Sequence, residues 1–91
     1  MIFLTLKNHY PNEDKFSHKI TNKILRQKKY SQLISLYLNY NFQVKNVNHM
    51  TNLKILHAGW NCGIDDEGIS KLNLIELYAS YNNKITKKFE K

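Results

Sequence analysis

The sequence predicts a small α/β fold in which short parallel strands stack in register behind a helical N-terminal segment. Two observations lead to this prediction. One apolar pattern occurs three times, at spacings of 20 and 21 residues, and a fixed period of this length is typical of proteins that stack one structural unit on the next. A chain of 91 residues is also long enough for only one small domain.

The three repeats share one order of residue types, L-x-x-L-x-[L/A]-x-x-N-x-x-[V/I]. In each repeat the second leucine and the residue two positions later alternate as a short strand with one buried face requires. This is the leucine-rich repeat pattern. We therefore expect the repeats 33–52, 53–73 and 74–91 to build the parallel strands of a short leucine-rich repeat solenoid.

An asparagine ends each predicted strand, and its short amide can hydrogen-bond backbone groups where the chain turns. We expect the three side chains to stack as an internal ladder, formed by Asn41, Asn61 and Asn82. Apolar residues between the repeats are spaced to pack under the sheet through a short helix or 3₁₀ turn. Asp65 is the predicted N-cap of the second of these turns.

Residues 1–32 form the predicted N-terminal cap. Residues 3–6 alternate as a short strand would, and apolar residues on one helical face predict a helix near 13–30. We expect this segment to cover the open edge of the first repeat. Its basic residues also allow binding to nucleic acid or to a membrane surface. They are Lys19, Lys23, Arg26, Lys28 and Lys29.

The net charge of +7 lies at the two ends of the chain. Residues 1–30 contribute +5 and residues 84–91 contribute +3, while the segment between them carries −1. A basic surface attracts nucleic acid through the phosphate charge, so binding through the basic ends is an alternative function. The opposing interpretation is that an AT-rich genome enriches Asn, Lys and Ile without selection for binding.

The residues that alternate with the buried ones project from the predicted sheet in rows across the strands. Neighbouring strands lie about 4.8 Å apart, so each row is a continuous stripe. Two rows together carry five aromatic rings and a histidine, which makes this strand face the predicted protein-binding site. The first aromatic row is Tyr37, His57 and Tyr78, and the second aromatic row is Tyr40, Trp60 and Tyr81. An outer row of Ser35, Ile55 and Glu76 and a middle row of Asn39, Gly59 and Ser80 accompany them.

Two other interpretations of these rings are open. Cross-strand aromatic pairs can simply stabilise a sheet, and the second aromatic row can turn inward at the strand ends. His57 has neither an acid nor a nucleophile beside it in the pattern, and the histidines show no metal-ligand spacing. We therefore expect no catalytic residues, no metal, no cofactor and no enzyme activity. Cys62 is expected to be partly exposed and inert.

Four segments carry a narrower likeness: 47–56 (VNHMTNLKIL), 59–69 (GWNCGIDDEGI), 72–77 (LNLIEL) and 82–86 (NNKIT). Together they resemble the leucine-rich repeats of giant amoeba-infecting DNA viruses of the mimivirus type. The resemblance implies a horseshoe-type repeat with a protein-binding role and no known catalysis. It also implies a host-cell protein as the partner and the host cytoplasm as the location.

The C-terminus shows no capping device comparable to the N-terminal segment. Phe89 can fold over the last repeat, and an uncapped repeat can also self-associate. A chain with so few repeats can equally be a degenerate fragment of a longer repeat protein, which is the second alternative to a protein-binding module. The sequence has no apolar run long enough to cross a membrane and no signal-peptide pattern, so an intracellular, non-secreted protein is expected.

Overall fold

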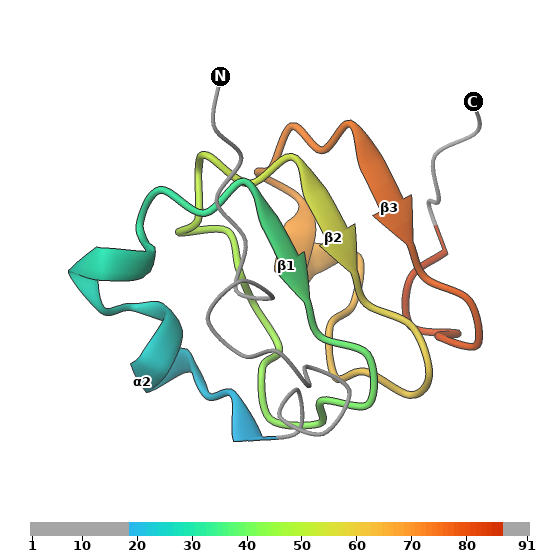
Figure 1. Cartoon of the computed structure of the whole chain (residues 1–91). Helices are drawn as coiled ribbons and strands as arrows, with labels where there is room; N and C mark the ends of the chain where they lie inside the picture. Colours follow the sequence, from blue (N-terminus) through green and yellow to red (C-terminus); the bar gives the residue numbers. More distant parts are fainter. Residues whose placement is uncertain (1–18, 87–91) are drawn as a thin grey trace.

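The computed structural model describes residues 19–86, and their strands form one three-stranded parallel sheet in the order β1-β2-β3 (Figure 1). The middle residues of the strands pair with one another across the sheet, so successive repeats stack in the register that their pattern predicts. The predicted α/β class and parallel sheet are thereby confirmed. The strands are β1 (Ser35–Tyr37), β2 (Ile55–His57) and β3 (Glu76–Tyr78).

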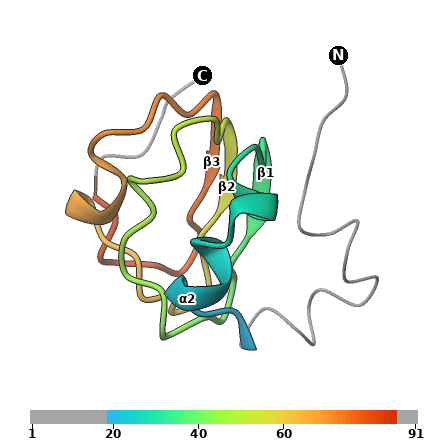
Figure 2. The ribbon, with the colours of Figure 1, turned by 90° about the vertical axis from the view of Figure 1, so that its left-hand side faces the viewer.

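The sheet forms one side of the described chain, and the segments that connect the strands form the other (Figure 2). Each connection leaves the end of one strand, runs beneath the sheet and returns to the start of the next strand (Figures 1 and 2). One face of the sheet is therefore covered by these connections. The opposite face carries the residues that alternate with the core.

The core lies between the sheet and the connections, because each repeat places its pattern leucines there. Leu36 and Leu56, at the centres of β1 and β2, are completely buried. The apolar residue after each strand turn returns to the same core, as its spacing predicts. Val44, Ile64 and Ile85 are all buried.

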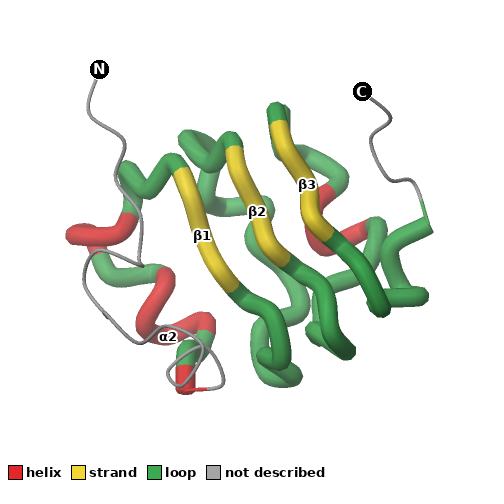
Figure 3. Tube along the Cα trace, turned by 45° about the vertical axis from the view of Figure 1, so that its right-hand side comes forward, coloured by secondary structure: helices red, strands yellow, loops and turns green. Residues whose placement is uncertain are grey.

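The helices are short (Figure 3): α2 (Asn22–Leu25), the 3₁₀ helix η3 (Lys28–Tyr30) and the 3₁₀ helix η4 (Glu67–Ile69). The predicted helix near 13–30 is therefore not continuous in its described part. Gln27 is extended, with φ −65° and ψ 140°, and separates α2 from η3. This break lets both Leu25 and Tyr30 reach the core, although their spacing does not suit one face of a single helix. The predicted strand 3–6 and residues 13–18 lie outside the described residues.

The connections differ from one repeat to the next. Between the second and third strands, η4 follows Asp65, whose Oδ1 accepts a hydrogen bond from the Gly68 N–H at 2.8 Å. The N-cap position itself is Asp66, which makes no side-chain cap hydrogen bond, so the predicted N-cap at Asp65 is wrong by one residue although Asp65 binds a backbone N–H of the turn. The first connection contains turns and no helix. It passes so close to η4 that a Cβ on Gly68 would lie 2.2 Å from the Lys45 carbonyl oxygen.

Candidate functional site

Two of the three predicted ladder asparagines, Asn41 and Asn82, are buried and hydrogen-bond backbone groups at the turns after the strands. The Asn41 side chain donates to the Ile20 carbonyl at 2.8 Å and accepts from the Gln43 and Val44 N–H groups, both at 2.9 Å. The Asn82 side chain donates to the carbonyls of Ala58 and Ile64. Both side chains are buried, so they support the backbone beneath the strand face.

The prediction for the middle repeat is wrong by one residue. Asn61 is exposed, with φ 63°, and Cys62 is completely buried. In the middle repeat the Cys62 N–H donates to the Gly59 carbonyl at 3.1 Å. In the first repeat the equivalent hydrogen bond runs from the Asn41 N–H to the Leu38 carbonyl. The turn of the middle repeat therefore reaches the core one residue later. Asparagine tolerates a positive φ better than most residues, and cysteine behaves as a small apolar side chain, which favours the shift.

Cys62 consequently takes the buried position at the turn that an asparagine takes in the other two repeats. Burial raises the pKa of the thiol. The expected partial exposure of Cys62 is wrong for the same reason. Cysteine does occur at the asparagine position of leucine-rich repeats, which is the signal in the sequence that allows this assignment.

The first aromatic row crosses the middle of the strands as a stack. The rings of Tyr37 and His57 lie 5.2 Å apart, and those of His57 and Tyr78 lie 4.5 Å apart. Tyr37 and His57 are half-buried, while Tyr78 is exposed. The Tyr78 hydroxyl donates to Glu76 Oε1 at 2.7 Å, and this hydrogen bond to a carboxylate raises the pKa of Tyr78.

The second aromatic row forms a parallel stack just after the strands. The Tyr40 and Trp60 rings lie 5.7 Å apart, and the Trp60 and Tyr81 rings lie 4.3 Å apart. All three side chains are exposed, to 46%, 41% and 72% in chain order. They do not turn inward, so that alternative interpretation is wrong. The second row presents more open aromatic surface than the first.

The backbone under the second row is strained in every repeat. Tyr40, Trp60 and Tyr81 have φ values of 68°, 53° and 61°. In this left-handed region the Cβ of an ordinary residue approaches the carbonyl oxygen, which costs about 1–2 kcal/mol per residue. Glycine would adopt the same conformation without that cost. The backbone conformation therefore does not by itself favour an aromatic residue at this position in any of the three repeats.

The middle row keeps the two aromatic rows apart and holds the repeats together. The Asn39 side chain accepts a hydrogen bond from the Gly59 N–H at 2.7 Å. A Cβ on Gly59 would lie 2.5 Å from the Ser80 carbonyl oxygen, so only glycine fits this close approach. The outer-row residues Ser35, Ile55 and Glu76 are half-buried. The face is thus two aromatic stripes with little charge between them.

The basic residues of the N-terminal segment lie away from these stripes. Their five side chains are exposed on and around α2 and η3, and Lys29 Nζ lies 5.1 Å from the Tyr30 ring centre. Within residues 19–86, no three His, Cys, Asp or Glu side chains gather as a metal site. In the same range, no helix is long and apolar enough to cross a bilayer.

No family model, no curated protein and no solved structure matches this chain. The function is therefore inferred from the geometry of the strand face.

Proposed function

We propose that the protein is a non-enzymatic protein-binding module, a short leucine-rich repeat solenoid with an N-terminal cap, whose partner binds the strand face. The observation that carries this proposal is the second aromatic row. Three large exposed rings stand at backbone positions with positive φ, one in each repeat. Strain kept at a repeated surface position supports a functional role for the side chains there.

Aromatic side chains suit protein recognition for a physical reason. Tyrosine and tryptophan offer a large contact area, lose few rotamers on binding and carry a polar tip for a hydrogen bond. Here the stacking holds each ring beside its neighbour, so part of the ordering cost is met before binding. The second row is the centre of the proposed site. Tyr78 of the first row and its hydrogen-bonded partner Glu76 belong to the same site.

The low charge of the face supports a protein partner over nucleic acid. Of the predicted face residues only Glu76 carries a formal charge, and it is negative. A phosphate backbone would be repelled by a carboxylate and needs lysine or arginine contacts. The exposed basic side chains of residues 19–86 lie in the N-terminal segment and at Lys45, Lys71 and Lys84. None of them is a residue of the predicted face, so nucleic-acid binding would depend on other residues.

Photo-crosslinking tests this assignment directly. The resemblance to repeats of amoeba-infecting viruses makes an amoebal extract the first source of a partner. A photoreactive phenylalanine replaces Tyr81 in one variant and Phe42 in the control. Phe42 is equally suitable chemically, because it is 64% exposed and belongs to neither aromatic row.

We expect one saturable crosslinked product from position 81 and none from position 42. Equal products from both positions would mean unspecific adhesion of exposed rings and would contradict the proposal. Loss of the product in moderate salt or after nuclease treatment would favour the nucleic-acid alternative, because phosphate contacts weaken steeply with salt.

A further inference from the structure

The outer side of the last strand leaves part of the apolar core open. Leu36 and Leu56 are each followed by another strand and are completely buried, whereas Leu77 on β3 is only partly buried. A cavity of about 480 Å³ lies beside it. That volume is in the range of pockets that bind a ligand, about 300–1,000 Å³.

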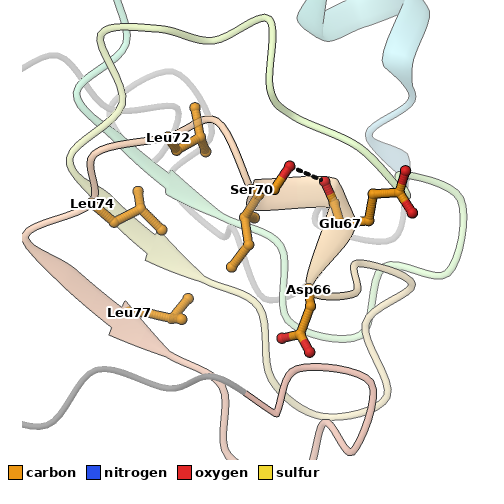
Figure 4. Close-up of a pocket in the computed structure, with 7 residues that line it drawn as sticks. Asp66, Glu67, Ser70, Leu72, Leu74 and Leu77 are labelled. Atoms are coloured by element: carbon orange, nitrogen blue, oxygen red, sulfur yellow. Dashed lines mark hydrogen bonds between the residues drawn. The ribbon is translucent and has the colours of Figure 1, made fainter.

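The cavity has an apolar floor and the Asp66 carboxylate at its rim, whereas the Glu67 carboxylate points away from the leucines (Figure 4). Leu72, Leu74 and Leu77 lie on the side of the strand, and Asp66, Glu67 and Ser70 lie on the side of η4. The Ser70 hydroxyl donates to the Glu67 carbonyl oxygen within the turn, so that hydroxyl is already engaged. The lining therefore suits an apolar side chain with positive charge next to it.

The chain itself leads to this rim. Asp66, which lines the cavity, accepts hydrogen bonds from both the N–H and the hydroxyl of Thr86. Thr86 is the last described residue, and the sequence continues Lys87-Lys88-Phe89-Glu90-Lys91. This continuation contains one aromatic residue with lysines on both sides, which is the chemistry that the cavity suits.

We propose that the cavity is the docking site of residues 87–91 and that it takes the Phe89 side chain. Phe89 is the third residue after Thr86, and an extended chain covers about 10 Å in that distance. Thr86 is bound to Asp66, which lines the cavity, so this segment begins at the rim of the cavity. The two lysines that precede Phe89 then enter the cavity beside Asp66, where opposite charges favour the contact.

Tethering makes this occupant more favourable than a second molecule. A short linker gives the attached group an effective concentration in the millimolar range or above, which free protein does not reach under ordinary conditions. The docked segment would cover Leu77 as each following strand covers the leucine before it. The inference is independent of the strand face, because the cavity lies between β3 and η4, and none of its lining residues belongs to the aromatic rows (Figure 4).

Methyl NMR of the full chain tests the proposal. A docked phenyl ring shifts the methyl resonances of Leu72, Leu74 and Leu77 through its ring current. We expect Phe89→Ala to remove these shifts and to lower the melting temperature by about 5 °C. Lys91→Ala is the matched control in the same segment and should leave both readouts unchanged, while Phe89→Trp should restore a ring-current shift.

Two results would overturn the proposal. The first is a set of leucine methyl resonances that does not respond to Phe89→Ala. The second is a response that depends on protein concentration together with a dimer in sedimentation experiments, which would make a second copy the occupant. A failure here leaves the strand-face proposal untouched, since the crosslinking experiment uses different residues.

Discussion

Replacement of Asn41 by alanine tests how the strand turns are held. The side chain accepts from the N–H groups of Gln43 and Val44 and donates to the Ile20 carbonyl. Ile20 and Val44 are buried, so alanine leaves one carbonyl and one N–H without a partner in the core. Each of the two groups costs about 1–3 kcal/mol, which gives an expected loss of about 2–6 kcal/mol. A domain of this size has a total stability of about 5–13 kcal/mol, so the variant loses a large share of it.

Urea denaturation followed by circular dichroism measures this loss, and Asn61→Gly is the matched control. The Asn61 side chain is exposed and its φ of 63° suits glycine, so the control should change the free energy of unfolding by no more than about 0.5 kcal/mol. The reasoning would be refuted if Asn61→Gly destabilised the protein as much as Asn41→Ala. That result would return Asn61 to the internal ladder in place of Cys62.

Three further predictions concern the core and its titrating groups. In a Phe89→Ala background, which leaves the cavity beside Leu77 empty, Leu56→Ala should cost about 2–5 kcal/mol in urea denaturation and Leu77→Ala less, about 1–2 kcal/mol, because Leu77 is partly exposed. Equal losses would contradict the open end of the sheet. The Cys62 thiol, buried and with a raised pKa, should react with a thiol reagent only when the chain unfolds, and rapid reaction of the native protein would be inconsistent with its burial. Burial and the charge of Arg26 hold the pKa of His49 below its ordinary value of 6.5, so the folded chain binds a proton less readily than the unfolded chain. Stability should therefore fall as the pH drops below about 6.5, and His49→Gln should flatten that part of the pH profile measured by thermal denaturation.

The parallel sheet was predictable from the sequence because the same apolar pattern occurs in all three repeats. Leucines at fixed spacing can satisfy the core only if the strands pair in register, and β1, β2 and β3 pair in that register. The position of the first aromatic row follows from the same alternation, and its rings stack across the strands. The second row has the same parity as the buried residues, and its rings are exposed because the chain turns there with a positive φ.

Three local features could not be predicted from the sequence: the buried residue at the middle turn, the break in the N-terminal helix and the positive φ of the second row. Asn61 and Cys62 are neighbours, and either can stand at the turn, so the outcome depends on which residue tolerates a positive φ. The helical pattern before the first strand was broken at Gln27 because Leu25 and Tyr30 both reach the core. Positive φ at Tyr40, Trp60 and Tyr81 has no signal in the pattern, since glycine or asparagine is the usual residue there.

A paired measurement of stability and binding on the double variant Tyr40→Gly/Tyr81→Gly tests the central claim most directly. Relief of backbone strain, about 1–2 kcal/mol per residue, offsets the lost ring contacts, about 0.5–1.5 kcal/mol each. The proposed role of the second row predicts a variant that is as stable as the parent, or slightly more stable, and that no longer binds the partner identified by crosslinking at position 81. A variant that unfolds more easily and still binds would show that these rings serve the fold and not recognition.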